Sequence, residues 1–191
     1  MIIDFSSPSS LDAVLDYAVS SSTPAVLCST GYTAEQVEKI KSVSNKVALF
    51  RSANMSLGVN AIINAVKEVA KKLYGFDVEV IEKHHHNKVD APSGTALMLF
   101  EGIKEVLPNS FAVMGRSGSS KRTENEIGIH SLRMGNVVGE HEVIVSTANQ
   151  TITLKHEAHN RSLFAEGAIV AGDFLLKQGV GLYNMKDLLK D

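Results

Sequence analysis

The sequence predicts an α/β protein in which a parallel sheet covered by helices is joined to a mixed α+β unit. Within the first fifty residues, short apolar runs alternate with segments of helical period, which is typical of a parallel sheet. Beyond Gly75 the apolar spacing changes to period two, as in a strand with one buried face. With a composition shift near Asn54, these patterns divide the chain into residues 1–53 with 162–191 and residues 54–161.

The first domain is expected to contain short buried strands, each followed by a helix. The expected strands are Ile2–Phe5, Ala25–Cys28 and Val47–Phe50. Ser7 and Pro8 are expected to open the first helix as N-cap and first helical residue. Thr33 and Gln36 have the spacing of a capping box for the second helix.

The second domain is expected to begin with a helix at about Ser56 that carries an apolar stripe to Leu73. In the alternating strand after it, one face carries Phe76, Val78, Val80, Glu82, His84 and His86. The remaining expected elements are a loop at 87–92, a helix from Ser93 towards Leu107, a polar loop at 115–126, strands at 127–133, 142–147 and 151–156, and helices at 162–177 and 185–190.

Composition excludes several classes of protein. Nineteen Lys and Arg residues against 21 Asp and Glu residues give a net charge of -2, so we expect no nucleic-acid or anionic-membrane partner. Cys28 is the only cysteine, which excludes an internal disulfide framework and fits a reducing compartment. The start of the chain has no signal-peptide pattern, and no apolar run is long enough to span a membrane. We therefore expect a soluble, cytoplasmic protein.

The segment Glu82–Thr95 carries the strongest chemical signal. On a strand, successive histidines of the run 84–86 point to opposite faces, so the three imidazoles do not converge on one ion. Lys88 follows the strand and can turn back towards the histidines. The Pro-Ser-Gly-Thr sequence at 92–95 starts a helix, whose free N–H groups and dipole stabilise an anion. Together these groups suit a small carboxylate substrate that takes up a proton.

Other interpretations of the same residues are open. A histidine-rich strand end is often only a solvated surface, and Pro-Ser-Gly-Thr alone is a common helix cap. A metal site at residues 84–86 is less favoured, because the sequence offers neither a cysteine partner nor an HExxH pattern. Only the combination of lysine, imidazoles and helix start is specific, and we expect no bound metal.

The segment Lys88–Ala96, preceded by Glu82 and His84-His85, closely resembles the signature of the 4-hydroxy-tetrahydrodipicolinate reductase family, formerly called dihydrodipicolinate reductase. The resemblance covers nearly the whole chain. The other matching segments are Ile3–Pro8, Cys28–Gly31, Ala53–Asn60, Ile127–Arg133, Val138–His141 and Arg161–Gly167.

The resemblance implies an oxidoreductase of bacterial lysine and diaminopimelate biosynthesis. Such an enzyme uses NADH or NADPH to reduce the cyclic product of the preceding synthase to tetrahydrodipicolinate. His84 would be the catalytic proton donor and acceptor, and Lys88 a second proton donor. The residues that would hold the substrate carboxylates are His85, Lys88, Ser93, Gly94 and Thr95. The resemblance further implies a homotetramer that pairs through the strands of residues 127–156, and it assigns no role to His86, which is expected to lie on the surface.

The resemblance also places the cofactor at strand ends of the first domain. The expected cofactor-binding residues are Phe5, Ser7, Cys28, Ser29, Thr30, Ser52, Ala53, Asn54 and Met55. Cys28 and Ser29 stand where the family usually has Gly and Thr. Cys28 is expected to be a small buried hydrophobic residue rather than a nucleophile.

The family's first strand, Gly-rich phosphate turn and first helix have no counterpart in this sequence, where Gly31 is the only glycine before Gly58. The expected fold is therefore a partial Rossmann-type parallel sheet without its first βαβ unit, plus an α+β substrate and oligomerisation domain with a mixed sheet. Because the missing turn normally holds the pyrophosphate of a dinucleotide, we expect weak cofactor binding and low turnover.

Three alternatives to an active reductase are open. The chain is a substrate-binding and assembly module that has lost catalysis, or a metal-dependent enzyme that uses His84–His86, or another two-domain dehydrogenase such as homoserine dehydrogenase. The pairing of His-His-x-x-Lys with Pro-Ser-Gly-Thr argues against the last of these.

Overall fold

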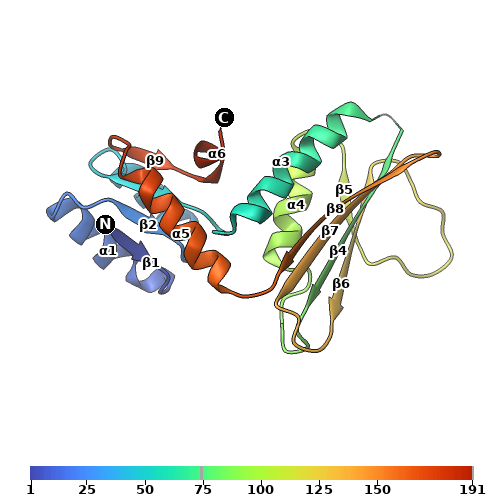
Figure 1. Cartoon of the computed structure of the whole chain (residues 1–191), viewed down its shortest axis with the longest axis horizontal. Helices are drawn as coiled ribbons and strands as arrows, with labels where there is room; N and C mark the ends of the chain where they lie inside the picture. The colour runs from blue at the N-terminus through green and yellow to red at the C-terminus, as the bar shows by residue number, and fades with distance from the viewer. Residues whose placement is uncertain (74, 191) are drawn as a thin grey trace. The chain divides into compact units, whose positions relative to one another are not determined.

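The computed structural model describes residues 1–73 and 75–190. The chain forms two compact units, Met1–Leu57 with Ser162–Asp191 and Gly58–Arg161. The first unit contains a parallel sheet and the second a mixed sheet (Figure 1). This α/β architecture, with one parallel and one mixed sheet, confirms the fold class predicted from the sequence.

The first unit is built on four parallel strands in the order β1-β2-β3-β9. They are β1 (Ile2–Asp4), β2 (Ala25–Leu27), β3 (Ala48–Arg51) and β9 (Gly181–Tyr183). The helical segments of this unit are the 3-10 turn η1 (Pro8–Ser10), α1 (Leu11–Ser20), α2 (Ala34–Val43), α5 (Ser162–Leu175) and α6 (Met185–Leu188). Strand β9 was not expected from the sequence, because three half-buried residues carry too little pattern to be recognised.

Alternation along the buried strands creates a separate core on each face of this sheet. Leu27 and Leu49 pack in one cluster with Leu11 and Leu15 of α1. The other cluster joins alternate residues of the same strands to α5 and α6. Its buried members are Val26, Cys28, Ala48, Phe50, Met55, Ala168, Ala171, Leu175 and Met185. The sheet is therefore covered on both faces, as a parallel sheet requires.

Two helix starts were predicted from capping motifs, with different outcomes. The capping box is confirmed: the Thr33 hydroxyl accepts a hydrogen bond from the Gln36 backbone N–H at 3.2 Å, and the Gln36 side chain accepts one from the Thr33 N–H at 3.0 Å. The predicted positions of Ser7 and Pro8 are confirmed: Ser7 is the N-cap and Pro8 the first residue of the 3-10 turn η1, which runs directly into α1 at Leu11. The Ser7 side chain, however, makes no capping hydrogen bond. The Ser7 hydroxyl contacts that of Ser9 at 2.8 Å, a local bond that competes with capping.

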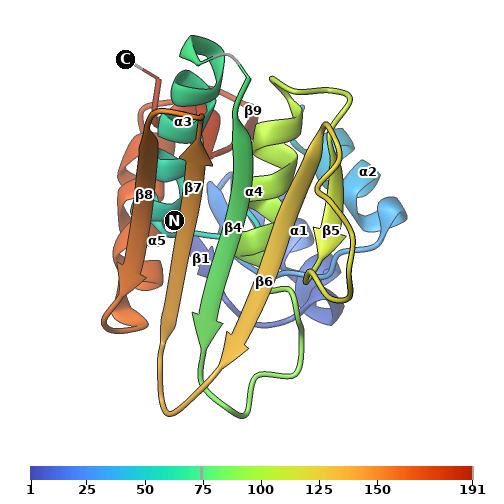
Figure 2. The same ribbon diagram turned by 90° about the vertical axis from the view of Figure 1, so that its right-hand side faces the viewer.

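The second unit is a five-stranded sheet in the order β5-β6-β4-β7-β8. The strands are β4 (Asp77–His84), β5 (Phe111–Met114), β6 (Glu126–Arg133), β7 (Gly139–Ser146) and β8 (Thr151–Ala158). The central strand β4 runs parallel to β6 and antiparallel to β7. Helices α3 (Leu57–Lys72) and α4 (Gly94–Lys104) lie behind the sheet in Figure 2, on its buried face.

Strand β4 places the side chains of Glu82 and His84 on the face that the helices cover. Its even-numbered residues from Val78 to His84 are buried, as the period-two pattern predicted. The prediction that the strand continues to His86 is wrong. After His84 the chain reverses in a turn, in which the Lys88 N–H donates to the His85 carbonyl at 3.1 Å. Strand β5 was not expected, and β7 starts at Gly139 rather than Glu142.

No helix in the described part of the chain is both long and apolar enough to cross a membrane.

Candidate active site

A buried carboxylate and an imidazole form the centre of the candidate site. Glu82 and His84 lie two residues apart on β4, so strand alternation points both towards the helix-covered face. Glu82 has no exposed surface, and His84 is 9% exposed. The Glu82 Oε2 atom lies 2.5 Å from His84 Nδ1. This is a direct carboxylate–imidazole hydrogen bond.

Arg133, the last residue of β6, holds the Glu82 carboxylate from the neighbouring strand. The parallel register of β4 and β6 sets Arg133 opposite His84. Its guanidinium donates to Glu82 from Nη1 at 2.9 Å and from Nη2 at 2.7 Å. The backbone N–H of Ser93 adds a third donor at 3.2 Å. Such a bidentate pair with an additional donor satisfies a carboxylate that has no contact with water.

These contacts decide the charges at the centre of the site. Burial raises the pKa of Glu82, but hydrogen bonds from Arg133, Ser131 and His84 together hold it below the ordinary value. Burial lowers the pKa of His84, the hydrogen bond to Glu82 opposes this, and the charges of Lys88 and Arg133 add to the lowering. Glu82 is therefore ionised, and His84 is mainly neutral at pH 7.

The start of α4 is the part of the site for which the sequence predicts anion binding. Ser93 is the N-cap, and its hydroxyl accepts a hydrogen bond from the Ala96 N–H at 3.2 Å. Gly94 follows it as the first helical residue, and no heavy atom lies within 4 Å of where its side chain would project. The first turn of α4 therefore has open space beside it, where its N–H groups favour a negatively charged ligand.

His141 of β7 is a site residue that the sequence reasoning did not single out. It lies opposite Glu82 in the β4–β7 ladder, and its Nε2 atom is 3.0 Å from the Ser93 hydroxyl. Its ring packs edge-on against that of His84 with centroids 5.2 Å apart. Burial, together with the charge of His84, lowers the pKa of His141 to about 4. Its place on the inward face of a predicted strand is the signal that could have found it.

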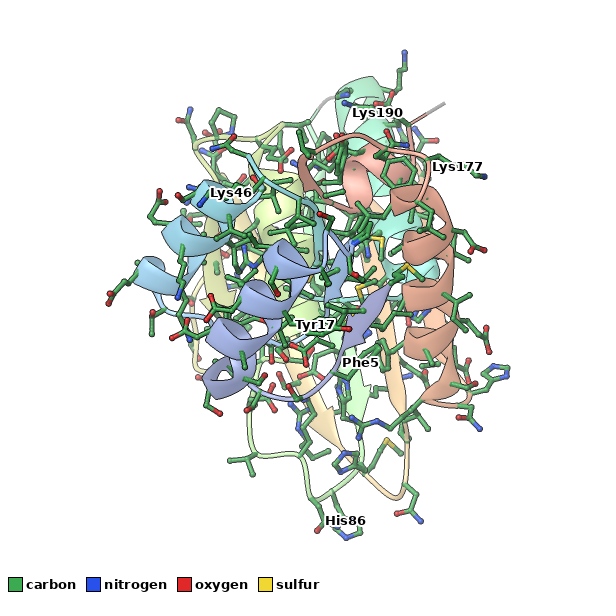
Figure 3. All side chains as sticks on the ribbon, turned by 90° about the vertical axis from the view of Figure 1, so that its left-hand side faces the viewer. Phe5, Tyr17, Lys46, His86, Lys177 and Lys190 are labelled. Atoms are coloured by element: carbon green, nitrogen blue, oxygen red, sulfur yellow. The ribbon has the colours of Figure 1, made fainter. Side chains whose placement is uncertain are left out.

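The turn after β4 carries the remaining predicted residues of this unit. Lys88 pairs with Asp90 at 2.7 Å and lies close enough to lower the pKa of His84. His85 and Thr95 are half-buried. His86 is exposed, as expected, and its Nδ1 atom lies 2.9 Å from the Gly135 carbonyl oxygen. Figure 3 shows its side chain at the tip of the turn, pointing outwards.

The structure does not bring the histidine run together as a metal site. Across the described residues, no group of three or more His, Cys, Asp or Glu side chains is placed to hold a metal ion. His84 faces the helix-covered side of the sheet, while His86 lies on the surface.

The cofactor-binding residues predicted in the first unit follow the carboxyl ends of β1, β2 and β3. Because these strands are parallel, their carboxyl ends meet at one edge of the sheet, which is where open α/β sheets bind ligands. At that edge the Ser29 hydroxyl lies 3.3 Å from Asp4 Oδ2, and the Ser52 hydroxyl donates to the Asn54 carbonyl at 2.7 Å. Phe5, Ser7, Thr30 and Ala53 are exposed.

Two of the predicted cofactor residues have their side chains in the core. Cys28 and Met55 pack in the cluster beneath α5, so only their backbone can face a ligand. Burial, together with the charge of Asp4, raises the pKa of the Cys28 thiol to about 12, which rules out a thiolate nucleophile near neutral pH. Gly167 of α5 lies so close to Met55 that a side chain there would collide with the Met55 carbonyl oxygen.

A parallel α/β unit joined to a mixed-sheet unit, with a buried carboxylate–histidine pair beside the start of a helix, fits the class of two-domain reductases and dehydrogenases. The family comparisons agree. The model described as "Dihydrodipicolinate reductase, N-terminus" matches residues 1–55, and the one described as "Dihydrodipicolinate reductase, C-terminus" matches residues 58–189. The chain therefore belongs to the dihydrodipicolinate reductase family, a family of oxidoreductases.

Individual relatives match over nearly the whole chain. The 4-hydroxy-tetrahydrodipicolinate reductase of Clostridium tetani is 47% identical, over 99% of this chain and 75% of its own length. That of Clostridium novyi is 48% identical, over 100% of this chain and 76% of its own length. The solved structure of dipicolinate-bound dihydrodipicolinate reductase from Paenisporosarcina sp. TG-14 superposes with a TM-score of 0.81 at 25% identity, over 99% of this chain and 73% of that one.

Proposed function

We propose that this protein reduces 4-hydroxy-tetrahydrodipicolinate to tetrahydrodipicolinate in lysine and diaminopimelate biosynthesis, with NADH or NADPH as reductant. The reaction adds a hydride and a proton to the substrate, and the 4-hydroxyl group leaves as water. The observation that carries the proposal is the His84 imidazole, held by a buried carboxylate beside the first turn of α4. Membership of the reductase family supports the same activity.

The mixed-sheet unit would bind the substrate and exchange protons with it. His84 would act as proton donor and acceptor, and Lys88 as a second donor whose positive charge also attracts a dicarboxylate. The substrate carboxylates would be held by His85, Lys88, Ser93, Gly94 and Thr95. The exposed Gly94 at the first turn of α4 supports this assignment. So does the solved relative described as dipicolinate-bound, because dipicolinate is a dicarboxylate of similar size.

The parallel-sheet unit would bind the nicotinamide cofactor at the carboxyl edge of its strands. When bound, the reduced nicotinamide supplies the hydride. The protein groups proposed to line its site are Phe5, Ser7, Ser29, Thr30, Ser52, Ala53 and Asn54, with Cys28 and Met55 contributing through their backbone. The hydroxyl groups of Ser29 and Ser52, buried at this edge, fit a ligand that carries a carboxamide.

The proposed domain division follows the sequence analysis: residues 1–53 and 162–191 for the cofactor, and 54–161 for the substrate and for assembly. A homotetramer in the cytoplasm belongs to the same proposal. Size-exclusion chromatography with light scattering would test the tetramer, which predicts four times the chain mass of 20.6 kDa.

The test is to incubate the purified chain with the product of the preceding synthase and to follow oxidation of NADH and NADPH by absorbance. Turnover that is inhibited by pyridine-2,6-dicarboxylate supports the proposal. Binding of pyridine-2,6-dicarboxylate without turnover supports instead the alternative of a binding and assembly module. A chain that binds neither the dicarboxylate nor the cofactors refutes both.

A further inference from the structure

We propose that Glu82, anchored by Arg133, is a positioning residue that fixes the tautomer of His84, so that Nδ1 keeps its proton and Nε2 is the nitrogen that exchanges protons with the substrate. The proposal deepens the proposed function and rests on it for the identity of the substrate. It concerns Glu82 and Arg133, which were assigned no catalytic or binding role from the sequence.

The first argument is the convergence of donors on one buried carboxylate. Glu82 is completely buried, yet two guanidinium N–H groups of Arg133 and the backbone N–H of Ser93 reach it. An arginine side chain is a permanent cation in proteins, so the ion pair keeps Glu82 ionised. The orientation of the carboxylate is thereby set by β6 and by the start of α4, independently of His84.

The second argument follows from what an ionised carboxylate can do. It accepts hydrogen bonds and donates none. Since Glu82 Oε2 lies 2.5 Å from His84 Nδ1, the hydrogen between them must sit on Nδ1. Neutral His84 therefore carries its lone pair on Nε2, and protonation adds the second hydrogen there. Proton exchange by His84 is confined to Nε2.

The third argument is the space around that nitrogen. A side chain at Gly139 of β7 would place its Cβ atom 3.1 Å from His84 Nε2, which is closer than most Cβ contacts in proteins. The backbone of Gly139 lies outside the left-handed region, so its conformation does not require glycine. Room for Nε2 does. Among the described residues, no hydrogen-bond partner of Nε2 is present.

Charged and titratable groups surround His84 on every packed element. They are Glu82 on the same strand, Lys88 on the following turn, Arg133 on β6 and His141 on β7. The two cations oppose protonation of His84, and Glu82 is the only anion among the four. Replacing Glu82 by a neutral group therefore leaves only charges that lower the pKa of His84.

Glu82→Gln is the discriminating variant, because the structure dictates how its amide must turn. The oxygen that receives both Ser93 N–H and Arg133 Nη2 must remain an acceptor. The amide NH2 therefore takes the place of Oε2, where it faces His84 and loses the hydrogen bond from Arg133 Nη1. That NH2 donates to Nδ1 and forces the hydrogen of the neutral imidazole onto Nε2. The contact with Ser93 survives, so the first turn of α4 should keep its ability to bind a carboxylate.

The experiment is 15N NMR of histidine-labelled full-length protein, with the His84 signals assigned by difference from His84→Gln. We expect the Nδ1–H tautomer in the wild type, and in Glu82→Gln the Nε2–H tautomer with a lowered pKa. In steady-state assays, kcat of Glu82→Gln should fall by about 100-fold, the scale of general acid–base catalysis, with KM nearly unchanged. Glu101→Gln, an exposed position of α4, is the matched control and should behave as the wild type.

A neutral wild-type His84 with its hydrogen on Nε2 would overturn the proposal, and this measurement needs no variant to fold. An unaltered tautomer, kcat and pH profile in Glu82→Gln would overturn it as well. The tautomer is read without substrate or cofactor. A wild-type chain that shows the Nδ1–H tautomer but no reductase turnover would therefore refute the proposed function and support the positioning role.

Discussion

Replacing Arg133 by Met removes the guanidinium that is hydrogen-bonded to Glu82 and leaves a buried carboxylate behind. Breaking a buried ion pair in this way typically costs 3–5 kcal/mol. Glu82 is fully buried, but Arg133 retains 18% exposure of its side chain, and the Ser93 N–H remains as a donor. We therefore expect the free energy of unfolding to fall by an amount near the lower end of this range, about 3 kcal/mol at pH 7. For a chain of 191 residues this corresponds to a fall in Tm of about 6–12 °C.

The pH dependence of this loss has a definite sign. In the wild type the folded-state pKa of Glu82 is lowered, so its contribution to stability is present above the unfolded pKa of about 4.3 and is lost as pH falls through the folded value. Burial is the largest influence on Glu82 and Arg133 the largest opposing one, so we expect the pKa of Glu82 to rise above its ordinary value once Arg133 is removed. The ionised carboxylate then opposes folding of the variant at neutral pH. The difference in free energy of unfolding between variant and wild type therefore becomes smaller as the pH is lowered.

The assay is urea unfolding followed by far-UV circular dichroism at pH 7 and at about pH 5. Lys71→Met, which breaks the exposed Lys71–Glu68 pair on α3, is the control and should unfold at the wild-type urea concentration. A loss below about 1 kcal/mol for Arg133→Met, the scale of surface pairs, would refute the reasoning. A difference in free energy of unfolding between variant and wild type that is the same at both pH values would refute it as well.

Three further predictions concern the site and its surroundings. Lys88→Ala should abolish turnover while leaving the circular dichroism spectrum unchanged, and an active variant would remove Lys88 from the mechanism. Gly139→Ala should lower kcat by about 10-fold, a part of the acid–base contribution, because its methyl group crowds His84 Nε2. Stopped-time assays would measure kcat, and an unchanged melting curve would show that the variant is folded; a wild-type kcat would contradict the prediction. Cys28, with its thiol pKa raised to about 12, should resist iodoacetamide at pH 8 in the native protein and react in urea, as mass spectrometry would show.

Much of the fold could be predicted because its patterns are local. The strand-and-helix alternation, the capping box at Thr33 and the period-two burial of β4 each depend on residues near one another in sequence. The errors are local as well. Strands β5 and β9 have only four and three residues, too few for a pattern to emerge. At Ser7 a hydroxyl suited to capping bonds to a neighbouring serine instead.

In the candidate site, too, the features that depend on local pattern were predicted and those that depend on the turn were not. Period two alone predicted that Glu82 and His84 share the buried face of one strand, and the Pro-Ser-Gly-Thr motif predicted the helix start beside them. Period two also carried the strand on to His86, whereas the chain turns after His84. That difference separates buried His84, the proposed proton-exchanging residue, from its neighbours His85 and His86, and it depends on the hydrogen bonds of the turn.

The sequence by itself determined the fold class, the family and the segment proposed to carry the chemistry, because these depend on order and spacing along the chain. Only the tertiary structure decided which groups control His84. Arg133 lies 51 positions from Glu82 and reaches it only through the parallel register of β4 and β6. His141 approaches through the opposite edge of the same strand. Burial then determines what these contacts do, since a carboxylate without water must take its donors from the protein, and the strands around it supply them.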